Sequence, residues 1–314
     1  MTATIIPTQA SNKKDTAPTQ AAGTSRSRGR VSKPRRKVTL TVVLGFFAVL
    51  WLLPILGLLI TSLRNPIDAT TTGWWTVFGD FFGQDWTTRN FIDAFTNLDI
   101  GNNFLNSIAV AVPATILPIM FAAFAAYAFT FMDFKGKEIY FATIIGLLVV
   151  PIQVALVPIL QGYVSLQKIL GIQIVGTFPA AWIVHSAFAL PLAIFILRNY
   201  MATLPVSLIE AALVDGASHF MIFWRLVVPL SVPALASFAI FQFLWVWNDY
   251  LTAYIFIGNE NPVLTQALYN MLGQYAQGWQ GVAAGSFITI AVPITVFFSL
   301  QRYFVRGLTA GSVK

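Results

Sequence analysis

The sequence predicts an all-α polytopic membrane protein with six transmembrane helices and both termini in the cytoplasm. Of its 314 residues, 57% are hydrophobic and 10% are charged, against about 45–50% and about 25% in soluble domains. The mean hydropathy is +0.72, and six apolar runs reach the roughly 20 residues that a helix needs to cross a bilayer. These observations exclude an ordinary soluble enzyme. The predicted spans are residues 38–63, 104–130, 139–161, 174–197, 230–257 and 282–300.

Residues 1–37 differ from the rest of the chain in composition. They are rich in Thr, Ala, Ser, Gln and Pro, carry nine of the 19 Lys and Arg residues, and show no apolar periodicity. Such a composition is typical of a disordered segment. A cleaved signal peptide is not expected, because the apolar run that follows is a full membrane span. We therefore expect a disordered basic cytoplasmic tail, which touches membrane lipid, and a transmembrane domain over residues 38–314.

The distribution of basic residues predicts the orientation in the membrane. With the N-terminus in the cytoplasm, 16 of the 19 Lys and Arg residues lie on the cytoplasmic side, and Arg64, Arg89 and Lys168 lie outside. An excess of basic residues marks the cytoplasmic loops of membrane proteins. Because topology accounts for the net charge of +7, no nucleic-acid partner is expected.

Most predicted spans contain a proline away from their ends. Each proline removes a backbone hydrogen bond, and neighbouring helices or water must satisfy the freed carbonyl. An ordinary kink and a hinge are both open as interpretations. The residues are Pro54, Pro113, Pro118, Pro151, Pro191 and Pro293.

Two ionisable residues lie within the predicted spans, His185 in the fourth and Asp249 in the fifth. An autonomous, ion-coupled transporter needs polar ligands near the bilayer midplane, so this scarcity argues against one. We expect His185 to be a neutral, hydrogen-bonded residue of the interior. With no cysteine and two histidines, neither a metal site nor a catalytic site is predicted. No P-loop is present, because Gly136-Lys137 is followed by Glu138 rather than Ser or Thr, and no cofactor is expected in this chain.

The end of the fifth predicted span carries the polar and aromatic string WVWNDYL. The aromatic rings could stack on a sugar in a translocation path, or they could form an aromatic belt at the membrane interface. The acid could line the path or contact another helix or subunit. Both interpretations are open for Trp245, Trp247, Asn248, Asp249 and Tyr250.

The cytoplasmic segment 198–229 contains the most specific motif of the chain. Ser207 and Glu210 have the spacing of a capping box, and Leu208, Ile209, Ala212 and Leu213 line one face of a short helix. Asp215-Gly216 ends it, because glycine adopts the left-handed conformation at helix C-termini. A second amphipathic piece runs from His219 to Val227 and leads to Pro229. An exposed apolar face of this kind normally binds a partner.

These residues resemble the signature of permease subunits of binding-protein-dependent ATP-binding-cassette importers. That signature is E-A-A, three residues, Gly, nine residues, then I-x-L-P. Here Leu226 replaces the isoleucine and Val228 the leucine. The loop string, the WND of the fifth span and the C-terminal GLTAG (Gly307 to Gly311) are similar to the carbohydrate-uptake branch, and more narrowly to the smaller permease of maltose and α-glucoside importers. The matching residues of the signature are Glu210, Ala211, Ala212, Gly216 and Pro229.

The resemblance covers about residues 38–314 and implies the type I importer permease fold in a bacterial plasma membrane. It implies a second permease subunit, two ATPase subunits that hold ATP and Mg²⁺, and an extracytoplasmic sugar-binding protein. The loop would then be a coupling helix, with Glu210 as polar anchor, Asp215-Gly216 as the turn that seats it, and Ala211 and Ala212 allowing close approach. The implied substrate is a maltose, maltodextrin, α-glucoside or trehalose-type oligosaccharide. The alternatives are another solute such as glycerol phosphate, or an autonomous secondary transporter.

The predicted outer segment 64–103 carries five acidic residues and several aromatic ones. We expect an interfacial helix and a surface for the binding protein, with membrane anchoring by Trp and Phe as the other interpretation. The aromatic residues are Trp74, Trp75, Phe81, Phe82 and Trp86.

Overall fold

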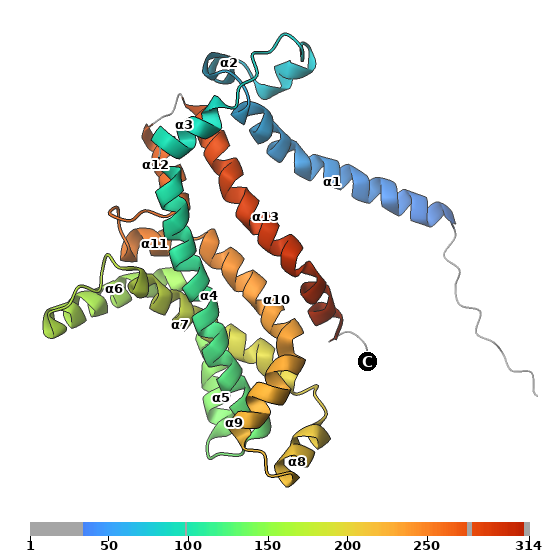
Figure 1. Ribbon diagram of the computed structural model, residues 1–314, viewed down its shortest axis with the longest axis vertical. Helices are drawn as coiled ribbons and strands as arrows, with labels where there is room; N and C mark the ends of the chain where they lie inside the picture. Colours follow the sequence, from blue (N-terminus) through green and yellow to red (C-terminus); the bar gives the residue numbers. More distant parts are fainter. Residues whose placement is uncertain (1–33, 98, 275–277, 311–314) are drawn as a thin grey trace, which may run out of the picture. The chain divides into compact units, whose positions relative to one another are not determined.

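A computed structural model describes residues 34–97, 99–274 and 278–310, so most of the predicted tail lies outside the described residues. The described part is built of helices and loops (Figure 1), with one isolated antiparallel bridge between Arg64 and Trp86. The chain divides into two compact units, Met1–Leu52 and Leu53–Lys314. The second unit contains helix α8, the His185–Asp249 pair and Arg64.

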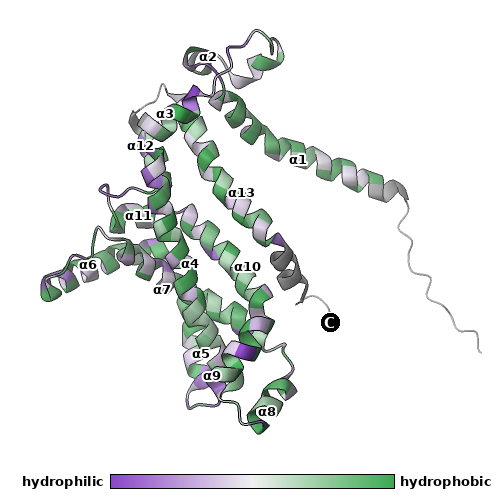
Figure 2. Ribbon diagram, viewed as in Figure 1, coloured by the Kyte–Doolittle hydropathy of each residue, from purple (hydrophilic) through white to green (hydrophobic). Residues whose placement is uncertain are grey.

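Helix α1 (Pro34–Ser62) begins in the first unit and ends in the second. From Val38 to Leu52 its side chains are exposed, and they are almost all apolar (Figure 2). A helix that is apolar all round suits lipid rather than water as its surroundings. Its candidate span, Val38–Ser62, is 25 residues long.

The second unit supplies four further helical segments that are long and apolar enough to cross a membrane. They are α4 (Ile100–Phe131), α7 (Phe178–Met201), the run His219–Trp247, and Trp279–Gln301 of α13 (Trp279–Ala310). A sixth span exists if a bent pair crosses as one unit. The described residues therefore hold five candidate spans, or six with that pair.

The bent pair differs from the single span predicted over residues 139–161, in which Pro151 was expected to form a kink or a hinge. Helix α5 (Lys137–Gly146) continues as η2 (Leu147–Val149), and α6 (Ile152–Leu170) then leaves at an angle of 103°. Pro151 is the residue before α6 and has extended backbone angles. Because proline has no N–H and disfavours helical geometry in the residue before it, the helix breaks here.

The fifth predicted span, residues 230–257, also differs from the structure. The helical run begins earlier, with α9 (His219–Ile222), passes through a π-helical turn η3 (Phe223–Val227), and continues as α10 (Val228–Trp247). It stops at Trp247, and after a three-residue break a separate helix α11 (Leu251–Phe256) follows. The string WVWNDYL thus spans a helix end.

Shorter helices connect these segments. Helices α2 (Pro66–Thr71), η1 (Trp74–Phe78) and α3 (Arg89–Asn97) precede α4, and α8 (Val206–Val214) lies between α7 and α9. Helix α12 (Leu264–Gln274) lies before α13. In Figure 1, α3 and α12 lie near one end of α4, and α5, α8 and α9 lie near its other end.

Helix α4 is the centre of the second unit and packs against α7 and α10, while α10 also packs against α13. The α4 and α7 surfaces that meet are rich in alanine, which allows close backbone approach in a membrane protein. Two polar side chains reach across to α4, Trp182 Nε1 donating to Ala109 O (2.8 Å) and Gln242 Nε2 to Ala114 O (3.1 Å). One hydrophobic cluster surrounds the N-terminal half of α4 and a second surrounds its C-terminal half.

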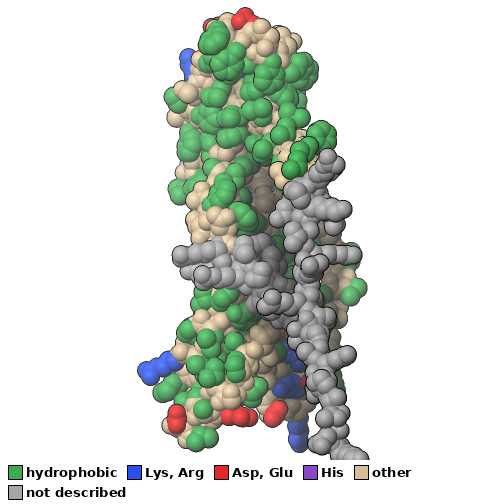
Figure 3. Space-filling model, turned by 90° about the vertical axis from the view of Figure 1, so that its right-hand side faces the viewer, with side chains coloured by type: hydrophobic (Ala, Val, Ile, Leu, Met, Phe, Trp, Pro, Cys, Tyr) green, Lys and Arg blue, Asp and Glu red, His purple; other side chains and the backbone are tan. Residues whose placement is uncertain are grey.

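On one face of this bundle (Figure 3), charged side chains lie near the two ends. On the face shown in Figure 3, the Lys, Arg, Asp and Glu side chains gather near the two ends, and hydrophobic side chains cover much of the described surface between them. This distribution is expected of a protein that spans lipid, because a charge at mid-membrane depth is costly.

Candidate functional site

The motif residues 210–216 form one short helix and its terminating turn. Helix α8 ends at Val214 with Asp215 as its C-cap, and Gly216 adopts a left-handed conformation with φ of +82°. The Ala217 N–H donates to Ala212 O (3.0 Å) and the Gly216 N–H to Leu213 O (3.0 Å). This pair of bonds is a Schellman motif, which satisfies the last carbonyls of a helix. The predicted glycine turn is therefore present.

The predicted capping box is wrong. Helix α8 begins at Val206 after Pro205, so Ser207 lies inside the helix, where it cannot cap the N-terminus, and no side chain caps that end. Glu210 consequently stands in the middle of α8 with an exposed side chain, and no salt bridge to it is found among the described residues. Its carboxylate is available to a partner.

Helix α8 is attached to the bundle along one narrow edge. Ile209 is buried in the cluster around the C-terminal half of α4, together with Ile222 and Phe223. The other apolar side chains of α8 are mostly exposed, and Figure 2 shows the helix as predominantly hydrophobic. Of the signature residues, Ala212 is half-buried; the exposed ones are Glu210, Ala211, Asp215, Gly216 and Pro229.

Replacing Gly216 with alanine is expected to loosen the end of α8. No atom lies within 4 Å of the position of an added Cβ, so the cost comes from the backbone, about 1–2 kcal/mol for a non-glycine residue in the left-handed region. Amide hydrogen exchange at Gly216 and Ala217 should become about tenfold faster in Gly216→Ala. Gly216→Asn is the control, because asparagine tolerates this conformation; equal exchange in all three proteins would contradict the assignment.

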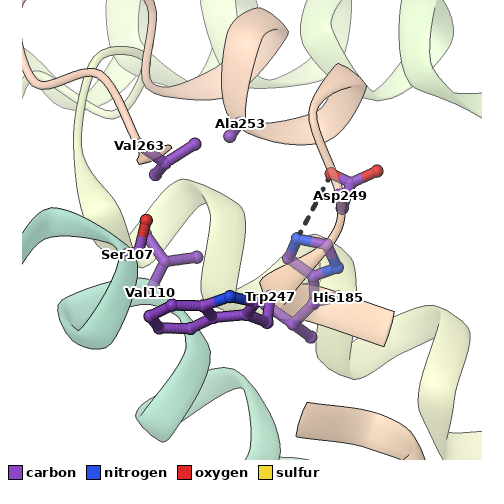
Figure 4. A pocket seen from close by; sticks show the side chains of 8 residues that line it. Ser107, Val110, His185, Trp247, Asp249, Ala253 and Val263 are labelled. Carbon is purple, nitrogen blue, oxygen red and sulfur yellow. Dashed lines mark ion pairs between the residues drawn. The ribbon is translucent and has the colours of Figure 1, made fainter. Parts of the chain in front are cut away.

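Far from this loop, the break after α10 carries a buried ion-pair geometry. His185 of α7 is 1% exposed and its Nε2 lies 3.7 Å from Asp249 Oδ2 (Figure 4). The predicted interior position is found, but neither ring nitrogen has a hydrogen-bond partner among the described residues. A cavity of about 10 Å³ adjoins the pair and is also lined by Ser107, Val110 and Trp247, which is room for one water molecule.

Asp249 also holds the backbone at this break. Its Oδ2 accepts a hydrogen bond from the Thr252 N–H (2.9 Å) at the start of α11, and its carbonyl accepts one from Thr265 Oγ1 (2.9 Å). Ser107 Oγ accepts from the Leu264 N–H (2.8 Å). Asp249 thus contacts α7 and α11 through its carboxylate and α12 through its backbone carbonyl.

The aromatic residues of the same string lie in different surroundings. Trp247 is 2% exposed, packs between Phe104 and Phe243, and donates from Nε1 to Thr289 O (3.2 Å). Trp245 is partly exposed and meets the His185 ring edge to face at 5.3 Å. Tyr250 is half-buried beside Tyr254 and Tyr269, and Asn248 is exposed. Within this chain, Trp247 is part of the core.

The segment before α4 folds around a buried arginine. Arg64 is 2% exposed and donates through Nη1 to the carbonyls of Thr72 (3.1 Å) and Gly73 (3.3 Å). Asn90 Nδ2 donates to the carbonyls of Ser62 (2.9 Å) and Arg64 (2.8 Å). Trp75, Phe81, Phe82 and Trp86 are exposed, whereas Trp74 is half-buried. This segment contains two short helices, α2 and α3, and the position of one of them at the membrane interface stays a prediction.

Sequence reasoning missed one contact near the loop. The Tyr127 hydroxyl of α4 and His219 Nδ1 of α9 share a hydrogen bond of 2.8 Å across 92 residues of sequence. The Tyr127 hydroxyl in the largely apolar run AAYAFTF was a usable signal, since a buried hydroxyl needs a partner. Its partner could not be read from the sequence.

These features define a polytopic membrane protein whose bundle displays a short, partly apolar helix with a central carboxylate at one end. Residues 118–310 match the family described as binding-protein-dependent transport system inner membrane component. The chain belongs to this family, the permeases of ABC importers, and its relatives include sugar-uptake permeases.

Two relatives and one solved structure give the scale of the similarity. The chain is 49% identical over 282 residues to the osmoprotective compounds uptake permease protein GgtD of Synechocystis sp., covering 89% of this chain and 93% of that protein. It is 52% identical over 230 residues to the alpha-glucoside transport system permease protein AglG of Rhizobium meliloti, covering 73% of this chain and 60% of that protein. A bacterial ABC transporter that imports alginate contains a chain of the same fold, with a TM-score of 0.70, 21% identity, and coverage of 90% of this chain and 100% of that chain.

Proposed function

We propose that this chain is one of two permease subunits that together form the translocation path of an ATP-driven sugar importer. ATP and Mg²⁺ bind to two cytoplasmic ATPase subunits, and α8 carries the coupling between those subunits and the path. A solute-binding protein delivers the sugar from outside. The single observation that carries this proposal is the exposure of Glu210 on a helix that packs against the bundle through Ile209 and Ala212.

The surface of α8 has the composition of a docking site. Val206, Leu208, Leu213 and Val214 are exposed around the Glu210 carboxylate. Leaving such side chains in water has a free-energy cost of about 25 cal/mol per Å² relative to burial. A partner that covers them and supplies a donor to Glu210 gains both the burial and a charge-assisted hydrogen bond.

The distribution of charge supports placing α8 in the cytoplasm of a bacterial cell, with the chain in its plasma membrane. Lys135, Lys137, Arg198 and Arg225 belong to the segments near the α8 end of the bundle, whereas Arg64 and Arg89 lie before α4. The basic loops of a membrane protein face the cytoplasm.

The scarcity of charge within the described spans supports a neutral solute. An anion such as glycerol phosphate calls for basic residues along its path, and the middle of the described spans has none. The relatives are named for alpha-glucoside uptake and for uptake of osmoprotective compounds. We therefore propose α-glucosides as the substrate class, with maltose and trehalose-type sugars among them.

Uptake is expected to persist when ion gradients are dissipated and to stop when ATP is depleted. Such coupling requires a ligand with different affinities for the inward- and outward-facing states, and ATP on the partner subunits supplies it. Labelled α-glucoside uptake by cells, with an ionophore in one arm and an energy poison in the other, measures this. Uptake that follows the ion gradient would instead support an autonomous secondary transporter.

The substrate can be found with the assembled complex. The chain is co-expressed and purified with the products of adjacent genes, and ATP hydrolysis is measured with the binding protein and a panel of solutes. Stimulation by α-glucosides is expected, and stimulation by glycerol phosphate alone would contradict the proposed class.

A further inference from the structure

An aromatic cluster joins α4 to α9 and to the start of η3, in the helical run that follows the loop. Phe124 stacks on Phe223 with ring centroids 4.4 Å apart, and Tyr127 meets the rings of Phe223 at 5.6 Å and His219 at 6.0 Å. Trp224 adds an edge contact to Phe124 at 5.9 Å. Aromatic rings of α4 therefore pack directly against aromatic rings of the α9–η3 segment.

One hydrogen bond fixes this contact. Tyr127 is 4% exposed, and its Oη shares a hydrogen bond of 2.8 Å with His219 Nδ1. His219 and Phe223 are four residues apart and lie on one face of the helix, which is the face turned to Tyr127. Since a buried hydroxyl without a partner costs free energy, the bond favours this one register of α9 against α4.

The position of the contact matters for α8. Only Ala217 and Ser218 lie between the turn at Gly216 and α9, and Ile209 of α8 is buried in the same cluster as Tyr127, Ile222 and Phe223. A movement of α8 must therefore either carry α9 and α4 with it or break this packing. Phe223 is also the first residue of the π-helical turn Phe223–Val227, and such turns are frequent at functional sites.

We propose that Tyr127 and His219 are positioning residues that transmit the movement of α8 to α4. This inference rests on the proposed role of α8 in coupling and adds the route by which the movement enters the bundle. The transmission passes from Ile209 to Phe223 and His219, and from there through the hydrogen bond and the stacked rings to Tyr127 and Phe124. Contiguous packing and hydrogen bonds of this kind are the physical basis of coupling between sites.

The test uses the complete complex with its second permease, ATPase subunits and solute-binding protein. Tyr127→Phe removes only the hydroxyl and keeps the ring. We expect assembly and basal ATP hydrolysis to be unchanged, and stimulation by the solute-loaded binding protein to fall about two- to tenfold, the factor that one hydrogen bond supplies. The ATP hydrolysed for each solute transported should rise by a similar factor.

Further variants, with a matched control, separate transmission from stability. His219→Leu should match Tyr127→Phe, and the double variant should lose no more than either single one. His219→Asn should restore stimulation, because an amide oxygen can stand near the place of Nδ1. Tyr200→Phe is the control, since it removes another interhelical bond at this end, from Tyr200 Oη to Leu230 O (3.2 Å), and should leave stimulation unchanged.

The experiment distinguishes a failure of this inference from a failure of the proposed function. If Tyr127→Phe lowers the melting temperature and basal activity but leaves the stimulation ratio unchanged, the residue has only a structural role and the inference is overturned. If the ratio is unchanged in Tyr127→Phe but lost in Glu210→Ala, the transmission route is wrong and the proposed function stands. If neither variant changes the ratio, α8 is not the coupling element.

Discussion

Glu210→Ala is expected to abolish solute-stimulated ATP hydrolysis by the assembled complex while the chain remains folded in the membrane. The side chain is exposed and makes no salt bridge among the described residues, so its loss costs the fold little. A hydrogen bond to a charged group contributes about 1.5–3 kcal/mol. Its loss should therefore lower the population of the docked, coupled state by a factor of at least about ten. ATP hydrolysis with and without solute-loaded binding protein measures the ratio.

The control for this variant is Glu138→Ala. Glu138 is another exposed acid, in the first turn of α5 near the same end of the bundle, and it lies outside the signature. The Glu138→Ala substitution removes one negative charge, as Glu210→Ala does, but leaves α8 unchanged. Stimulation of ATP hydrolysis should therefore remain normal in this variant. Equal losses in both variants would point to the charge of this end of the molecule rather than to docking of α8, and normal stimulation in Glu210→Ala would overturn the docking proposal.

Trp247→Ala is expected to produce a large loss of stability. The indole is 2% exposed, lies between Phe104 and Phe243, and donates a hydrogen bond to Thr289 O. Truncating a buried Trp typically costs about 3–5 kcal/mol. Thermal unfolding of the purified protein in detergent, together with its yield in the membrane, measures the effect.

Two substitutions at this end of α10 separate packing from solute binding. Trp247→Phe keeps stacked rings and loses only part of the volume and the hydrogen bond, so its loss should be smaller. Trp245→Ala removes a ring that is 39% exposed and should also cost less. A Trp247→Ala protein with a normal melting temperature and an altered KM for solute would instead favour the translocation-path interpretation.

Local features were the most readable from the sequence. The end of α8 followed from Asp215-Gly216, because the left-handed turn that closes a helix depends on one residue and its neighbours. The capping box failed for an equally local reason, because Pro205 already precedes the first turn and places Ser207 inside the helix. The sequence shows that Pro151 can interrupt the helix, but it does not give the angle of 103°. That angle depends on how the segments on either side of the proline pack against neighbouring helices.

The sequence by itself determined that this chain is a polytopic membrane protein, roughly where its helices cross, and which loop carries the family motif. Lipid satisfies no backbone groups, so long apolar runs must become helices. Only the tertiary structure decided which sides of those helices meet: Trp247 in the core, His185 beside Asp249, and Tyr127 bonded to His219. A helix that is apolar all round has no polar face to distinguish lipid from protein, so these pairings appear only when the helices pack.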